Sequence, residues 1–117
     1  MDDKRKMQFI EAGVEIESAL ERFMDNDEML KKFLKKFMDD KNFETLFCAM
    51  DSKDYEEAFE AAHTLKGVCG NLSLQELNQF VCKEVEYLRA KEYEMAEKYI
   101  PELKEAYEEA IEKIKKL

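Results

Sequence analysis

The chain has 117 residues, of which 45% are hydrophobic and 40% charged, so it is long enough for one domain around a single core. Its formal net charge of −9 argues against a surface for nucleic acid or for anionic membranes. Only three glycines and one proline are present, and this scarcity of turn residues predicts an all-α protein. No apolar run approaches the roughly 20 residues that a membrane-spanning helix needs.

The three cysteines, Cys48, Cys69 and Cys82, form no C-x-x-C pair, and with a single histidine they give no metal-ligand spacing. Neither a metal nor a cofactor is therefore expected. An odd, unpatterned set of cysteines without a secretory leader indicates reduced thiols in a cytoplasmic protein. The chain begins with Met1 and shows no long linker, so we expect a free-standing monomer with one domain over residues 1–117.

The spacing of apolar residues predicts an antiparallel up-down four-helix bundle over residues 26–117. Residues 1–25 are expected to form an N-terminal helical cap across one end of that bundle. Within the cap, residues 4–24 should form one or two short helices, broken near Gly13. Short polar links join the bundle helices, and short links favour antiparallel neighbours.

Two capping-box patterns mark the expected starts of the second and third bundle helices. They are Asp54 with Glu57, and Ser73 with Glu76. The second helix is expected to end near Gly70, where glycine precedes asparagine.

The first and the last bundle helices each contain residues that can bend or end a helix. The first is expected to run as one helix over residues 27–50 after an Asn26 cap, with a place where it could bend near Asp39. The last carries Pro101, a residue that suits a first turn, so this helix is expected to start at Tyr99 or to be kinked there.

The only histidine, His63, falls in the second bundle helix. At about 100° per residue it lies roughly 130° from the middle of the apolar stripe of that helix, so it is expected to be exposed. Lys66, Gly67 and Gly70 fall on the same side. A glycine inside a helix costs about 1 kcal/mol relative to alanine, so Gly67 indicates close approach of another molecule. The stripe consists of Tyr55, Ala58, Ala62, Leu65, Cys69 and Leu72.

An exposed imidazole is mostly neutral near pH 7, so one ring nitrogen keeps a lone pair and is a competent nucleophile. Phosphoryl transfer needs positioning and charge stabilisation more than covalent help, and a nearby lysine could supply the charge. The chain has no glycine-rich nucleotide loop, so we expect no use of ATP. On base rates, a lone helical histidine is an ordinary surface or core residue, and Met and Phe stripes are core.

The string Ala62-His63-Thr64-Leu65-Lys66-Gly67, followed by Asn71-Leu72, resembles the signature of histidine-containing phosphotransfer (HPt) domains. The helix pattern extends this resemblance over nearly the whole chain. It implies a four-helix bundle in which His63 receives a phosphoryl group from a receiver-domain aspartate and passes it to another receiver. By position, Lys66 steadies the phosphoryl oxygens and Gly67 keeps the approach open.

The resemblance also implies the partners, which are receiver domains of response regulators or of hybrid sensor histidine kinases. The receiver brings the Mg²⁺, and the HPt domain is a phosphocarrier without kinase activity. Gly70 and Arg89 are the expected docking or phosphate contacts. The alternative is a pseudo-HPt adaptor that binds receivers or kinases without being phosphorylated, and the presence of His63 favours the carrier.

This chain departs from the family pattern at two positions. Many members have glycine where it has Ser73, which is expected only to alter a turn. Many also place a polar residue on the facing helix, 22 positions after the histidine, where this chain has Val85 between Glu84 and Glu86. The resemblance therefore assigns no helper hydrogen bond to His63 from that position.

Overall fold

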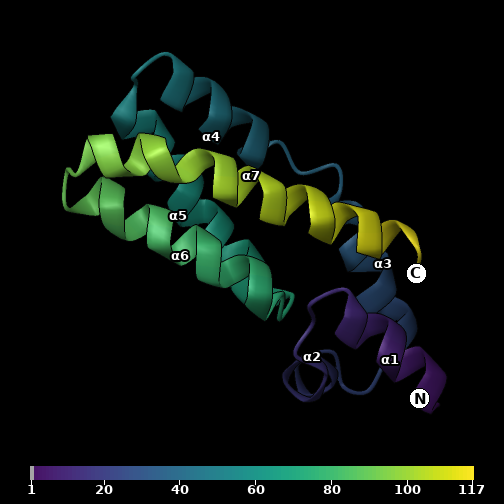
Figure 1. The fold of residues 1–117 in the computed structure, drawn as a ribbon. Coiled ribbons are helices and arrows are strands. Elements are labelled where there is room, and N and C mark those ends of the chain that lie inside the picture. Colours follow the sequence, from purple (N-terminus) through teal and green to yellow (C-terminus); the bar gives the residue numbers. More distant parts are fainter. Residues whose placement is uncertain (1) are drawn as a thin grey trace.

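The structure is a computed structural model that describes residues 2–117, and throughout this range the regular elements are α-helices. Figure 1 shows an elongated molecule with α1, α2 and α3 towards one end, and its extents are 45 × 22 × 19 Å. None of the helices within residues 2–117 is long and apolar enough to cross a bilayer. The helices are α1 (Asp3–Glu11), α2 (Ile16–Arg22), α3 (Asp27–Phe37), α4 (Asn42–Asp51), α5 (Tyr55–Asn71), α6 (Gln75–Arg89) and α7 (Tyr93–Lys115).

The bundle is built from consecutive helices that pack in sequence order, α4 against α5, α5 against α6 and α6 against α7 (Figure 1). The ring of Phe43 in α4 stacks on that of Tyr107 in α7, with centroids 4.0 Å apart, and this contact joins the first bundle helix to the last. The centre is filled by fully buried side chains such as Leu46, Leu65 and Leu103. The predicted all-α bundle is therefore confirmed.

The expected single helix over residues 27–50 is wrong, because the chain breaks between Phe37 and Asn42. The backbone N–H of Asp40 donates to the Phe37 carbonyl at 3.1 Å, which tightens the last turn of α3. The Asp40 carboxylate then accepts from the Asn42 backbone N–H at 2.8 Å, so it satisfies a free donor at the start of α4. The break lies at the aspartates where a bend was anticipated.

The expected capping box of Ser73 with Glu76 is also wrong, because no side chain caps α6 and Leu74 occupies the N-cap position. Ser73 is buried in the α5–α6 turn with a φ of 55°, in the left-handed region. Its hydroxyl lies 3.1 Å from that of Ser18, and its carbonyl accepts from the Glu15 N–H at 2.8 Å. Ser73 thus fastens the N-terminal helices to the bundle.

The last helix starts at Tyr93 and continues through Pro101, so the alternative in which it starts at Tyr99 is wrong. An interior proline costs about 3 kcal/mol because it removes one backbone hydrogen bond and crowds the preceding turn. Ala96 and Leu103 on either side are fully buried, and their contacts oppose that cost. Packing against the rest of the bundle therefore decides where α7 begins.

The N-terminal segment forms two short helices that separate near Gly13, as predicted. Gly13 has a φ of +87°, a conformation that side-chain-bearing residues rarely adopt, so it suits the sharp change of direction. Immediately afterwards Val14 pairs with Leu74 in an isolated antiparallel bridge. This bridge adds a second link between the N-terminal helices and the α5–α6 turn.

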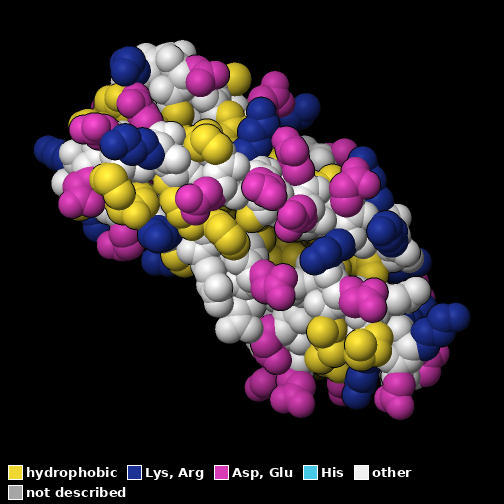
Figure 2. All heavy atoms as spheres, viewed as in Figure 1, with side chains coloured by type: hydrophobic (Ala, Val, Ile, Leu, Met, Phe, Trp, Pro, Cys, Tyr) yellow, Lys and Arg dark blue, Asp and Glu magenta, His cyan; other side chains and the backbone are white. Residues whose placement is uncertain are grey.

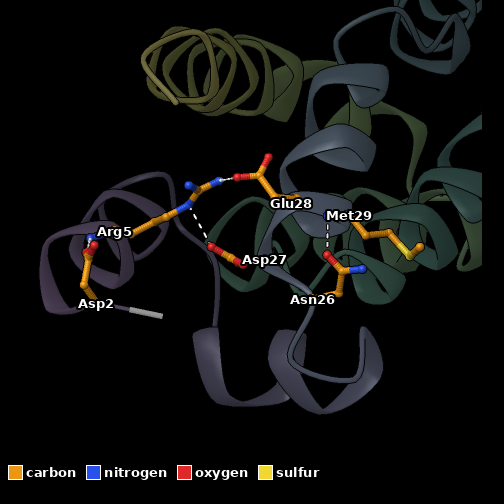
Figure 3. A network of polar contacts seen from close by, with 6 residues as sticks. All are labelled: Asp2, Arg5, Asn26, Asp27, Glu28 and Met29. Carbon is orange, nitrogen blue, oxygen red and sulfur yellow. Dashed lines mark hydrogen bonds and ion pairs between the residues drawn. The ribbon is translucent and has the colours of Figure 1, made fainter.

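Polar contacts hold α1 against the start of α3 (Figure 3). The Arg5 guanidinium lies 2.9 Å from the Asp27 carboxylate and 2.6 Å from that of Glu28. The predicted Asn26 cap is confirmed, since its side-chain oxygen accepts from the Met29 N–H at 3.0 Å. Partly exposed ion pairs contribute little each, so these contacts orient the two helices more than they stabilise the fold.

Candidate functional site

His63 lies on α5, a helix of 17 residues in which only half of the predicted capping box is formed, because the Asp54 N–H donates to the Ala49 carbonyl and not to the Glu57 side chain. The Asp54 carboxylate accepts a hydrogen bond from the Glu57 N–H at 3.2 Å. Ala58 and Leu65 are fully buried on one face of α5, whereas His63 is exposed on the opposite face. The periodicity of the apolar residues therefore predicted the exposure of His63 correctly.

Figure 2 shows which side chains gather on one face of the molecule. Figure 2 shows a face to which α6 and α7 contribute, with many acidic side chains and no histidine in view. Because His63 is the only histidine of the chain, its imidazole opens on a different face. A partner that approaches His63 therefore need not cover the acidic surface seen in Figure 2.

The closest aromatic neighbour of the His63 imidazole is Phe59, one turn earlier on α5. The two ring centroids are 5.8 Å apart and the ring planes are inclined at 42°. Sequence reasoning missed Phe59, although its position four residues before His63 already places it on the same helix face.

Lys66 and Gly67 lie one turn after His63. Lys66 is half-buried and forms no ion pair with any residue from 2 to 117, so its ammonium is available to an incoming anion. Gly67 is exposed, and a Cβ added there would meet no atom within 4 Å. Packing against a neighbouring helix therefore does not explain this glycine, and the space beside it is open.

The two predicted docking residues lie in different surroundings. Arg89, on α6, reaches towards the site, with its guanidinium carbon 5.8 Å from the centre of the Phe59 ring and an ion pair to Glu86. Gly70 lies two turns beyond His63, and a Cβ there would stand 3.7 Å from the Asn78 side chain. Arg89 thus belongs to the surroundings of His63, whereas Gly70 faces the α5–α6 groove.

The facing helix offers the imidazole no hydrogen bond. Val85 is fully buried, and its neighbour Glu84 is fully buried as well. Neither carboxylate oxygen of Glu84 has a hydrogen-bond partner among the described residues, and burial raises the pKa of this carboxyl group to about 8. Burial and nearby carboxylates, Glu84 among them, raise the pKa of Tyr99 on α7. Glu84 therefore belongs to the α6–α7 side of the core.

The site contains one nucleophile, one available cation and open space, and it is exposed on a helical bundle. Across residues 2–117, no group of three histidine, cysteine, aspartate or glutamate side chains gathers in a way that could hold a metal ion. These are the features that the transfer of an anionic group to a side chain would require.

Comparison with known protein families agrees with that description. A family model described as Hpt domain matches residues 15–113. The chain therefore belongs to the family of histidine-containing phosphotransfer domains. These domains transfer phosphoryl groups in two-component signalling, interact with receiver domains and kinases, and have no kinase activity of their own. Searches among curated proteins and among solved structures gave no match.

Proposed function

We propose that this chain is a phosphorelay intermediate in which His63 accepts a phosphoryl group from a receiver phospho-aspartate and passes it to another receiver. A ring nitrogen of the neutral imidazole attacks the phosphorus, and a P–N bond forms as the P–O bond to the aspartate breaks. The aspartate leaves as a carboxylate, and the proton on the other ring nitrogen stays in place. The same steps in reverse load the second receiver.

Three neighbours support this reaction at His63. The Lys66 ammonium is one turn away and acts as a point charge for the phosphoryl oxygens. Gly67 leaves room for the backbone of a receiver to approach the imidazole. The guanidinium of Arg89 can exchange the Glu86 carboxylate for the phosphoryl group, because both are anions that guanidinium binds well.

A groove of about 410 Å³ between α2, α3 and the end of α5 offers a docking surface on one flank of this site. The rings of Phe23 and Phe33 and the side chain of Val68 line it. The charged residues of the lining are two cations, Arg22 and Lys36, and one carboxylate, Asp40, so the groove carries one net positive charge. In a chain with a net charge of −9, this local positive charge suits the acidic phosphorylation site of a receiver. The unpaired thiols of the three cysteines support a cytoplasmic location.

The exposure of the only imidazole of the chain, beside open space, is the observation that carries this proposal. The test is incubation with receiver domains that have been phosphorylated by acetyl phosphate, followed by intact-mass measurement. We expect one phosphoryl group per chain, labile in acid and stable in alkali, as a P–N bond requires. His63→Gln should abolish the label and change the free energy of unfolding by no more than about 0.5 kcal/mol.

A label that persists in His63→Gln would contradict the assignment of the phosphoacceptor. An unlabelled wild-type chain that still binds receivers would instead identify an adaptor. Binding is measured on the same samples by titration calorimetry, so that the two outcomes are separated in one experiment.

A further inference from the structure

The His63 imidazole has no hydrogen-bond partner within residues 2–117, although a nucleophile must be held in line with the bond that it attacks. Val85 stands where the family resemblance would have placed a polar residue on α6, and it is apolar and fully buried. The carboxyl group next to it, that of Glu84, is directed into the α6–α7 side of the core. Orientation of the imidazole must therefore come from contacts other than hydrogen bonds.

The Phe59 ring is in a position to supply that orientation. It is half-buried, so its own rotation is limited by the surrounding helices, and it lies next to the imidazole at 5.8 Å between centroids. Residues four apart on a helix lie one above the other, and helical side chains lean towards the N-terminus, so the imidazole leans onto the Phe59 ring, which limits its rotation. A flat ring on one side leaves the outward side of the imidazole free for a partner.

Arg89 connects this pair of rings to α6. Its guanidinium carbon lies 5.8 Å from the centroid of Phe59, within the range of a cation–π contact. The Glu86 carboxylate pairs with the same guanidinium and so restricts its position. The order of contacts is thus Glu86, Arg89, Phe59 and His63, which ties the imidazole to α6 without any hydrogen bond to the imidazole itself.

We propose that Phe59 is a positioning residue for His63, and that Arg89 braces its ring from α6. This inference rests on the proposed phosphoacceptor role of His63 and explains how the nucleophile is ordered when position 85 is valine. In the unphosphorylated chain the imidazole keeps one side-chain rotamer. The receiver then meets an ordered nucleophile, and less ordering has to accompany the transfer itself.

The test compares Phe59→Leu with Phe59→Tyr, which restores the ring. In single-turnover transfer from a phosphorylated receiver, Phe59→Leu should lower the maximal rate about tenfold, because small misplacements of a reacting group are costly. The half-saturating receiver concentration should stay within a factor of about two, since docking is unchanged. Phe59→Tyr should recover most of the wild-type rate.

Phe47→Leu is the matched control, because Phe47 is another half-buried ring that packs on Tyr107, away from His63. It should transfer at the wild-type rate. Phe59→Leu at the wild-type maximal rate would overturn the proposal. An effect confined to the half-saturating concentration would also overturn it, since Phe59 would then be a docking residue.

A second measurement does not depend on transfer. Three-bond NMR couplings report whether the His63 side chain keeps one χ1 rotamer in the unphosphorylated protein. We expect one rotamer in the wild type and averaging in Phe59→Leu and in Arg89→Met. A single rotamer in both variants would refute the positioning role even if His63 proved to be the phosphoacceptor, and averaging would support it even if no transfer were observed.

Discussion

Replacing the buried carboxyl group of Glu84 should change how the stability of the bundle depends on pH. In the unfolded chain this group ionises near its ordinary pKa of 4.5, whereas the folded chain holds the proton up to a pKa of about 8. The folded state therefore binds more protons in this window, so stability is fully present below pH 4.5 and falls as the pH rises towards 8. Within this window the free energy of unfolding falls by about 1.4 kcal/mol per pH unit. The slope flattens near the upper pKa, where the folded chain also loses the proton.

For the wild type, the free energy of unfolding should drop by about 2 kcal/mol between pH 6 and pH 8 on account of Glu84. Glu84→Gln has no ionisable group at this position, so its free energy of unfolding should not show this decrease with pH. Glu84→Leu should in addition be more stable than Glu84→Gln, because it buries no polar atom without a partner.

The assay is urea denaturation followed by circular dichroism at pH 6, 7 and 8. The difference between wild type and Glu84→Gln isolates this one group, since all other titrating groups are common to both proteins. Glu105→Gln, which changes an exposed glutamate on α7, is the control and should keep the wild-type slope. Equal slopes in wild type and Glu84→Gln would show that Glu84 is not buried as a protonated acid.

The other predictions concern the face around His63. Lys66→Ala should slow phosphotransfer or shorten the lifetime of the phosphohistidine with little change in melting temperature; unchanged kinetics and lifetime would mean that Lys66 is only a surface lysine. Gly67→Ala should raise the free energy of unfolding by up to about 1 kcal/mol, because alanine favours a helix and the added Cβ meets no atom, while transfer falls. Gly67→Arg should stay folded by circular dichroism and block transfer more severely, and transfer at the wild-type rate would contradict the access argument.

Local sequence was sufficient for the features that depend on helix periodicity. The spacing of Ala58, Ala62 and Leu65 placed His63 on the outer face, and the structure has it exposed there. The Asp54 N-cap and the break at Gly13 were equally predictable, because each needs only residues close to it in the chain. The string around His63 was also sufficient to indicate the family.

Helix ends that depend on distant contacts were not predictable. Ser73 has the spacing of a cap, yet its hydroxyl lies beside Ser18, 55 positions away in sequence, and its backbone takes the left-handed conformation. Pro101 looked like the start of a helix, but buried residues on both sides of it keep α7 continuous. In both cases a tertiary contact outweighed a local preference.

The environment of single side chains was decided by the tertiary structure alone. Glutamate is almost never fully buried, so a sequence pattern assigns Glu84 to water. It lies between Val81 and Leu88 in the stripe that α6 buries, and once α7 packs on that side the carboxyl group cannot reach solvent. The contact of Arg89 with Phe59 likewise depends on how α5 and α6 pack. Periodicity fixes which face of a helix turns inward, whereas the packing of neighbouring helices fixes what each side chain meets there.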